Sequence, residues 1–357
     1  MAVAHFIHAR DRMIAAIAKE LSVTDVLTEI AGALHEVAVF DQWLLALTDP
    51  DTLLPAGGAV EGFGSESCTP FWDNELLDPD YSKYTALARS SDPVATLFEA
   101  TDGDLGRSPR YRKLLEPLGT TDELRAAFVT GTSCWAAATL VRSTSGGTFS
   151  SSEIQAVRDL LPVASRALRH AVTRRRIAEQ LAGPAILVLA PDGTIESMTP
   201  DAEPVLFDLR TFGLDDSVVP TAILAAAVRA KSNRSSTRIA VRARGESGNW
   251  LKVHASPLGT DGRVAVVIES AGSNDLVPIL LESYGLTERE TEVVMLIARG
   301  LATKEIAREL CISAHTVNDH IKVIFTKTGA ASRGELVANI FSNHLHAPHH
   351  ASTIHVG

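Results

Sequence analysis

The sequence predicts an α+β chain of several domains, in which two regions with antiparallel sheets precede an all-α region of four helices. With 357 residues and 45% hydrophobic composition, the chain exceeds one ordinary domain and has apolar material for two or three cores. Pairs of strand-like segments joined by short turns occur in two separate regions. From Leu286 onward this pattern stops and helix-capping residues recur instead.

The first expected domain covers residues 9–176. It opens with an amphipathic helical stretch, after which "DQWLLALTDPDTLLPAGG" predicts a strand, an Asp-Pro-Asp turn and a second strand. Two more strands are expected in "LRAAFVTGTSCWAAATLVRS", one on each side of Gly131. A long helix closes the domain, because Ser150 and Glu153 form a capping box ahead of a seam of apolar residues.

The second expected domain covers residues 177–271. Its opening, "GPAILVLAPDGTIESMTPDAEPVL", predicts a strand, a Pro-Asp-Gly turn, a second strand and a helix that begins near Asp201. Three further strands are expected in "TRIAVRAR", "NWLKVHAS" and "RVAVVIES". Residues 272–284 are expected to be a linker, and the His-rich tail over 346–357 is expected to be disordered.

The all-α region is expected over 285–345, and its helix ends are marked by capping residues. Thr287 with Glu290 forms a capping box for the first helix, which Gly300 ends. The later boundaries are Thr303 as cap of a short second helix, Ser313 and Gly329 as the ends of the third, and Ser332 with Glu335 as the start of the fourth. A short helix, a tight turn and a longer helix make a helix-turn-helix.

The third of these helices has one apolar face and one polar face. Residues at three- and four-residue spacing are expected to pack on the two preceding helices. The inward set is Val317, His320, Ile321 and Ile324, and the outward set is His315, Asn318, Asp319, Lys322 and Thr326.

The segment "LTERETEVVMLIARGLATKEIARELCISAHTVNDHIKVIFTKTGAASRGELVANIF" is similar, almost position by position, to the LuxR-type helix-turn-helix. The residues that carry the resemblance are Leu286, Thr287, Arg289, Glu290, Val293, Gly300, Lys304, Glu305, Ile306, Ala307, Leu310, Ile312, Ser313, Thr316, Val317, His320, Ile324, Lys327, Arg333 and Glu335. The resemblance covers a small C-terminal part of the chain and implies binding to double-stranded DNA, with the outward face of the third helix in the major groove.

The same resemblance assigns roles to single residues. Thr303, Lys304, Thr316 and Lys327 are expected to contact phosphate. Asn318 stands where the family commonly has Lys. Asn can pair bidentately with adenine, and Asp319 can accept a hydrogen bond from a cytosine amino group. The expected DNA-binding set is therefore Thr303, Lys304, His315, Thr316, Asn318, Asp319, Lys322 and Lys327.

The fourth helix is implied to be a dimer contact, through Val337, Ile340 and Phe341. The three residues recur at three- and four-residue spacing, which places them on one helix face. The chain is accordingly expected to act as a homodimer, with RNA polymerase as a further partner.

The order of elements in residues 9–176 resembles a GAF domain, and that in 177–271 resembles a shortened PAS domain. The whole order resembles actinobacterial regulators. These resemblances imply a one-component transcription regulator that senses an unknown small-molecule effector. Two alternatives stay open: a regulator controlled by a docked protein partner without a small-molecule ligand, and an enzyme. For an enzyme, the sequence offers no Ser/His/Asp, Cys/His or metal-ligand spacing.

Charge is unevenly divided along the chain, whose net charge is −10. Residues 285–345 hold seven basic and seven acidic side chains, so the excess of acid belongs to the remainder. A DNA-binding region without net charge, attached to an acidic sensor region, is expected to bind a DNA site with modest affinity. Dimerisation would strengthen that binding.

The remaining features are assigned ordinary roles. Cys68, Cys134 and Cys311 are too few and too far apart for a disulfide framework or a zinc cluster, and no cofactor or metal is expected. The sequence shows neither a signal peptide nor an apolar run of membrane-spanning length, so a cytoplasmic protein is expected. The arginines expected to form a solvated helix face are Arg166, Arg169, Arg174, Arg175 and Arg176.

Overall fold

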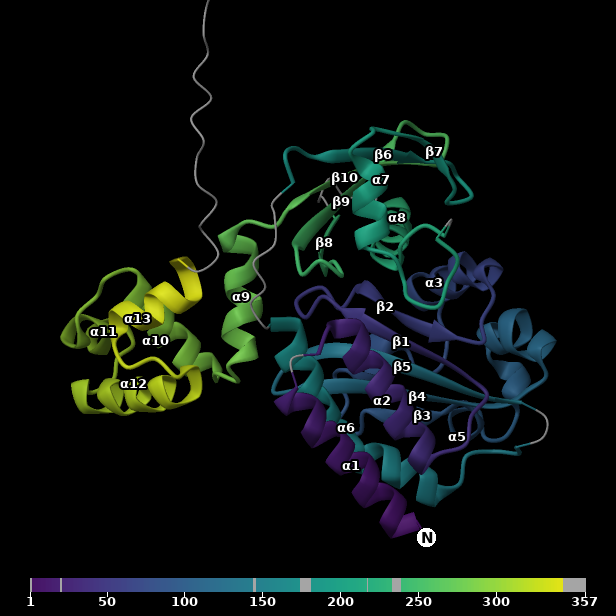
Figure 1. Cartoon of the computed structure of the whole chain (residues 1–357), viewed down its shortest axis with the longest axis horizontal. Coiled ribbons are helices and arrows are strands. Elements are labelled where there is room, and N and C mark those ends of the chain that lie inside the picture. Colours follow the sequence, from purple (N-terminus) through teal and green to yellow (C-terminus); the bar gives the residue numbers. More distant parts are fainter. Residues whose placement is uncertain are drawn as a thin grey trace, which may run out of the picture. The chain divides into compact units, whose positions relative to one another are not determined.

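The computed structural model describes residues 2–19, 21–143, 146–173, 181–216, 218–232 and 239–342. The chain divides into two compact units, one ending at Ser270 and one beginning at Ala271 (Figure 1). Three of the predicted arginines, Arg174 to Arg176, and the His-rich tail over 346–357 lie outside the described residues. None of the helices in the described ranges combines the length and the apolar character needed to cross a membrane.

The first unit holds two five-stranded antiparallel sheets. The first sheet has the order β2-β1-β5-β4-β3. Its strands are β1 (Gln42–Thr48), β2 (Pro55–Glu61), β3 (Val94–Thr96), β4 (Thr120–Thr130) and β5 (Ser133–Ser143). The two hairpins expected from the turn sequences are confirmed, because β1 pairs with β2 and β4 pairs with β5 in antiparallel register.

Three long helices lie on one side of this sheet: α1 (Ala2–Ala18), α2 (Val23–Val37) and α6 (Ser151–Thr173). The last two pack on the strands, and α1 packs on α2 and α6 (Figure 1). Ser150 and Glu153 form the expected capping contacts of α6. Shorter elements connect the strands: α3 (Cys68–Leu76), α4 (Tyr84–Leu87), α5 (Leu97–Ala100), and single turns at Ser65–Ser67, Leu105–Arg107, Tyr111–Leu115 and Glu116–Leu118.

The second sheet repeats the strand order of the first, as β7-β6-β10-β9-β8. Its strands are β6 (Ala185–Leu189), β7 (Ile195–Met198), β8 (Ile239–Arg244), β9 (Trp250–Leu258) and β10 (Arg263–Ser270). Two helices, α7 (Ala202–Asp208) and α8 (Thr221–Ser232), share a core with alternate strand residues. The sequence pattern does not predict α8, whose run of Ala side chains packs directly on β9.

The two sheets are joined inside the first unit by a buried ion pair. Asp49, in the turn after β1, accepts hydrogen bonds from the Arg242 amide at 2.8 Å and from its Nη2 at 2.6 Å. Their side chains are only 1% and 9% exposed. Backbone hydrogen bonds add to this joint, since the Val60 amide donates to the Phe212 carbonyl and the Phe212 amide to the Gly58 carbonyl.

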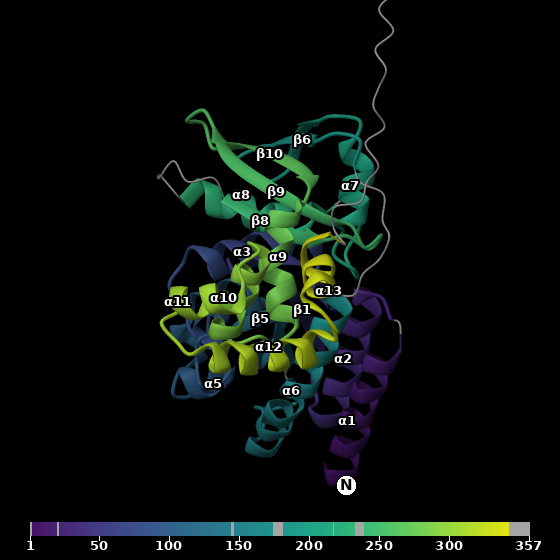
Figure 2. The ribbon, with the colours of Figure 1, turned by 90° about the vertical axis from the view of Figure 1, so that its left-hand side faces the viewer.

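The second unit is helical and contains α9 (Ser273–Ser283), α10 (Glu288–Ala298), α11 (Thr303–Glu309), α12 (Ala314–Thr328) and α13 (Arg333–Val337), followed by one π-turn over Ala338–Ser342. Figure 2 shows these helices gathered in one group. The expected linker over 272–284 is therefore mostly helix. Val277 and Leu281 of α9 are buried in the same core as Val293 and Ile324, which makes α9 part of this domain.

Most of the expected caps are present in this unit. Thr287 and Glu290 form a reciprocal capping box, Ser313 accepts from the Thr316 amide, and Gly329 ends α12 with φ +72°. The expected cap at Thr303 is wrong. Ala302 occupies the N-cap position, and its amide donates to the Glu305 carboxylate at 2.7 Å.

Candidate nucleic-acid interface

The candidate site is built on α11, a tight turn and α12. Ile306 and Val317 are fully buried, so apolar contacts fix the two helices against each other. Between them, Cys311 takes a left-handed conformation with φ +54°, and the Ile312 amide donates to the Ala307 carbonyl at 3.0 Å. A left-handed residue reverses the chain direction within a few residues. The arrangement is the helix-turn-helix that the sequence predicts.

The exposed face of α12 carries the predicted polar residues. His315, Thr316, Asn318, Asp319, Lys322 and Thr326 are all exposed. Val317, Ile321 and Ile324 are buried, and His320 is half-buried, as expected for the inward set. The structure therefore brings together the residues assigned to base reading.

Val323 lies on the same face, and the sequence analysis missed it. It is 43% exposed, although its neighbours Ile321 and Ile324 are buried. Its helical spacing could have placed it there, because position 323 is one turn beyond Asp319 and three residues before Thr326, which both face outward. An aliphatic side chain in a polar face can contact a thymine methyl group.

Asp319 is placed between two basic side chains on α12. Its carboxylate lies 3.7 Å from the His315 Nε2 and 3.8 Å from the Lys322 Nζ. All three are at least half exposed, so these are weak surface contacts. Their effect is local: the negative charge is partly offset on a face that would approach phosphates.

Lys327 makes internal contacts. Its Nζ lies 2.7 Å from a Glu290 carboxylate oxygen and 2.9 Å from the Gly285 carbonyl oxygen. Burial raises the pKa of Glu290, but hydrogen bonds from Lys327 and from the Thr287 amide outweigh it and hold that pKa below its usual range. This pair ties the last turn of α12 to the first turn of α10. The side chain of this lysine, which is expected at phosphate, is 31% exposed and has partners within the domain.

Thr303, Lys304 and Thr316 lie at the starts of the two helices. Lys304 is exposed at the start of α11. The Thr303 hydroxyl oxygen accepts from the Arg333 Nη2 at 2.7 Å, which leaves its proton available to another acceptor. Arg333 also donates to the Leu301 carbonyl at 3.1 Å. It therefore fixes the start of α11 from α13, a role that the sequence analysis did not assign.

The three residues expected at the dimer contact differ in their burial. Ile340 is fully buried in the core of its own domain together with Leu336, and Val337 is half-buried against that core. The side chain of Phe341 is outside the described residues. A three- and four-residue repeat identifies an apolar helix face but not the element that covers it. In this domain α9 packs on the segment that contains Ile340.

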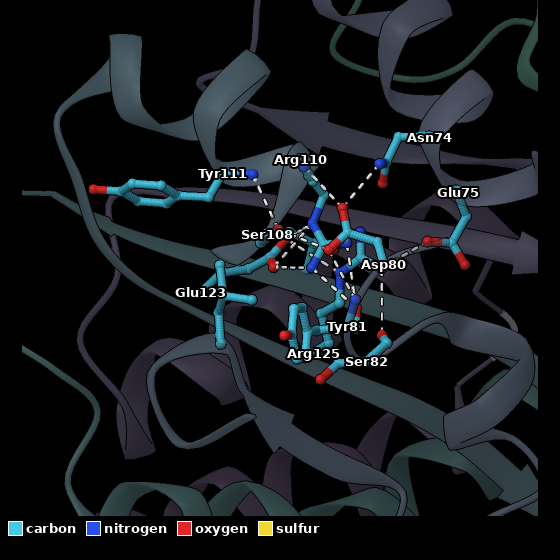
Figure 3. Close-up of polar contacts among 12 residues, drawn as sticks. Asn74, Glu75, Asp80, Tyr81, Ser82, Ser108, Arg110, Tyr111, Glu123 and Arg125 are labelled. Carbon is cyan, nitrogen blue, oxygen red and sulfur yellow. Dashed lines mark hydrogen bonds and ion pairs between the residues drawn. The ribbon is translucent and has the colours of Figure 1, made fainter. Parts of the chain in front are cut away.

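A second polar assembly lies inside the first unit, between the first sheet and its connecting segments (Figure 3). Arg110 Nη2 lies 2.6 Å from Glu123, and Arg125 Nη1 lies 2.6 Å from Glu75. Arg125 Nε also reaches Glu123 at 3.1 Å. These side chains are at most 2% exposed. We call this set, with Asp80, the buried ion network.

Asp80 completes the network at its outer end. Its carboxylate accepts from the Ser108 hydroxyl at 2.7 Å, the Arg110 amide at 2.7 Å and the Asn74 side-chain amide at 2.9 Å (Figure 3). The Arg125 guanidinium stacks over the Tyr84 ring, 4.5 Å from its centroid. The network fills this face of the sheet with paired charges, and within it Arg125 Nη2 and Asn74 Oδ1 are buried without a hydrogen-bond partner among the described residues.

Comparison with known proteins places the C-terminal unit in a family. Residues 284–339 match the family model "Bacterial regulatory proteins, luxR family". The chain is 45% identical over 53 residues to the transcriptional activator protein ExaE of Pseudomonas putida, covering 15% of this chain and 25% of that protein. It is 30% identical over 144 residues to the transcriptional regulatory protein LiaR of Bacillus subtilis, covering 40% of this chain and 64% of that protein. It thus spans less than two thirds of these relatives.

Solved structures resemble the chain only distantly. Escherichia coli SdiA is 13% identical with a TM-score of 0.33, over 96% of this chain and all of that one. The phage VqmA–DPO complex is 20% identical with a TM-score of 0.25, over 48% of this chain and 87% of that one. Scores this low do not indicate a shared overall fold. The match over residues 284–339 is different in kind, and the C-terminal region of the chain is a helix-turn-helix domain of the luxR family of bacterial regulatory proteins.

Proposed function

We propose that the chain is a cytoplasmic transcription regulator that binds specific sites in double-stranded DNA as a homodimer, with α12 in the major groove. The observation that carries the proposal is the exposed polar face of α12 on a luxR-family domain. An α-helix fits the major groove, where every base pair presents a distinct pattern of donors and acceptors.

The residues divide into readers and anchors. Asn318 is the proposed reader of adenine, Asp319 of a cytosine amino group, and Val323 of a thymine methyl group. His315 and Lys322 flank Asp319 at the same face. The proposed anchors on phosphate are Thr303, Lys304 and Thr316, which lie at the starts of α11 and α12. Lys327 is a further proposed phosphate contact, and its ion pair with Glu290 also braces α12 against α10.

Control by a small-molecule effector is proposed for the two-sheet unit, as a GAF-like region followed by a PAS-like region. The repeated strand order of the two sheets supports two related sensor folds. A pocket of about 330 Å³ supports a ligand, and its walls come from both. Leu47 and Gly58 line it from the first sheet, and Phe212 and Arg210 line it from the segment before α8. The volume is at the lower end of the range for small-molecule sites.

Control by a protein partner is the second candidate, and the buried ion network favours it. The face of the first sheet that carries Glu123 and Arg125 is filled by charges that pair with one another. An effector seated there would have to leave a buried charge without a partner, which costs several kcal/mol. A sensor of this kind would respond through its surface.

The test of DNA binding is a site selection with the full chain and random duplex DNA at fixed salt. A defined consensus is expected for the parent, and its loss is expected when Asn318 and Lys322 are both changed to Ala. Arg166→Ala, which removes an exposed charge from α6 in the other unit, is the matched control and should return the parent consensus. A parent chain that enriches no sequence would contradict the proposal.

The two modes of control are separated by denaturing the purified full chain and analysing released small molecules by mass spectrometry. A stoichiometric compound that is absent from a Phe212→Trp chain, in which the pocket wall is enlarged, supports the small-molecule effector. A chain that releases none, yet binds its selected site in a regulated manner in cells, supports the partner.

A further inference from the structure

The outer face of α1 carries exposed apolar side chains at the spacing of one helix stripe. Ile7 and Ile14 are 43% and 51% exposed, and Ala4 and Ala18 are exposed one turn beyond each of them. Together with Asp11 these residues follow the spacing of a single helix stripe. On its inner face, α1 buries Ala9, Met13 and Ala16 against its neighbours.

The neighbouring helix α6 provides a comparison. Both helices lie at the periphery of the unit (Figures 1 and 2). Apart from Pro162, the exposed positions of α6 are polar, and they include Ser152, Gln155, Asp159, Arg166 and His170. A helix that faces only water normally has such a polar outer face, so the isoleucines of α1 indicate a covered surface.

The charged residues beside the apolar stripe of α1 indicate which surface covers that stripe. Arg10 and Asp11 are adjacent at the middle of the stripe, their side chains are 48% and 59% exposed, and Arg10 Nη2 lies 3.1 Å from the Asp11 carboxylate of the same helix. An exposed pair of this kind is weak, so its members can exchange partners with those of a second copy. If a second α1 ran antiparallel about a two-fold axis between these two positions, Ile7 would face Ile14 of the other copy. Arg10 of each copy would then face Asp11 of the other copy, so the interface would contain two equivalent ion pairs. In a parallel pair, each charge would face its own like charge.

We propose that α1 is a dimerisation helix, which pairs antiparallel with α1 of a second copy of this chain. The surface is self-complementary, as a two-fold interface requires. The helix is held firmly in place for this role, because Arg12 pairs with Glu29 and Glu36 of α2. This inference goes beyond DNA binding, and it assigns dimerisation to the first unit and not to the segment that contains Ile340.

The first test measures the association of the full chain by sedimentation velocity without DNA. The parent is expected to be a dimer, and Ile14→Glu to raise the dissociation constant by at least about 100-fold, because it places two charges in an apolar contact. Gln155→Glu, on the polar face of α6, is the matched control and should leave the dimer intact. A monomeric parent, or an Ile14→Glu chain that dimerises as tightly as the parent, would overturn the proposal.

The second test fixes the direction of the pair by cross-linking. In a chain with Cys68→Ser and Cys311→Ser, a mixture of Ile7→Cys and Ile14→Cys proteins is expected to form a disulfide dimer, whereas either protein alone is not. Cross-linking by Ile7→Cys alone would mean a parallel pair and would overturn the register. Arg10→Asp and Asp11→Arg should each weaken the dimer, and the double change should restore it. Both tests are made without DNA, so their failure leaves the proposed DNA binding untouched.

Discussion

Asn318 and Asp319 occupy adjacent exposed positions on α12, and their chemistry differs in a way that separates affinity from specificity. An amide both donates and accepts, so a correct base gains two hydrogen bonds. A carboxylate only accepts, and near phosphates it is unfavourable everywhere except opposite a donor. The sequence alone indicated both residues, but not that His315 and Lys322 flank the acid.

Asn318→Ala is expected to weaken binding to the selected site by about 1 to 3 kcal/mol and to relax the preference at one base pair, because a bidentate contact is lost. Asp319→Ala is expected to strengthen nonspecific binding while narrowing the gap between good and poor sites. Site selection on both variants at fixed salt is the measurement. Unchanged base preferences with a uniform loss of affinity would mean that DNA shape supplies the specificity.

Lys304 and Lys327 are both predicted to contact phosphate, and Lys327 also holds an ion pair within its own domain. Lys304→Ala should lower the salt dependence of DNA binding by about one unit of slope without changing the melting temperature. Lys327→Ala should lower the slope as well and should also destabilise the second unit by about 1 kcal/mol, because Glu290 and the Gly285 carbonyl lose their donor. Binding titrations at several salt concentrations, combined with thermal melts, distinguish these effects. A Lys327→Ala chain with the parental slope would contradict its contact with phosphate.

At the scale of elements, the hairpins and most helix ends could be predicted from the sequence. The sequence did not indicate which helices and strands pack on one another. The β1–β2 and β4–β5 hairpins follow from local turn residues, and most caps follow from side chains three residues apart. Several helices were missed, and for α8 and α9 the physical reasons are clear. The uniformly apolar run of α8 has no helical period, and Pro278 within α9 made that segment resemble a connector.

Ile340→Glu tests the position of the final helical segment. Since Ile340 is fully buried in a core with Leu336, the change is expected to destabilise the second unit by several kcal/mol and not simply to separate two copies. The four tryptophans, Trp43, Trp72, Trp135 and Trp250, all belong to the first unit. Far-UV circular dichroism should therefore decrease while tryptophan emission stays constant. If the variant kept the parental helicity and stability, Ile340 would not be a core residue and the predicted dimer contact would be supported.

At the scale of the whole molecule, each unit has its own basis of stability. The second unit depends on an apolar core shared by its helices, whereas the first adds the buried ion network to its apolar cores. The network could not be predicted from the sequence, because Arg110 and Glu123 are 13 residues apart and Arg125 and Glu75 are 50 apart. Only the fold brings these partners together.

The network predicts acid sensitivity in the first unit. Burial opposes ionisation of Glu123, but Arg110 and Arg125 overcome it and hold its pKa below the usual 4.5. A lowered pKa contributes stability above the unfolded value, and that contribution is lost as the pH falls through the folded value. Tryptophan emission should therefore report unfolding of the first unit below about pH 4.5, the ordinary value for glutamate.

Glu123→Gln is the matched variant for this prediction. It should cost about 3 to 5 kcal/mol at neutral pH, because two buried guanidinium groups lose a carboxylate partner. It should also flatten the acid limb of the stability curve. The conservative control is Glu66→Gln, whose carboxyl lies in an exposed turn and which should match the parent. A Glu123→Gln chain with the parental acid profile would contradict the assignment.

The joint between Asp49 and Arg242 determines how a signal would spread through the first unit. Parting the two sheets would break this buried pair and the backbone hydrogen bonds beside it, so the two sheets are expected to move together. The sheets are then thermodynamically linked, and an effector that favours one arrangement of either sheet biases the other by the same free energy. Two sensor folds joined in this way would respond to their effectors together, through one coupled conformational change, and not independently.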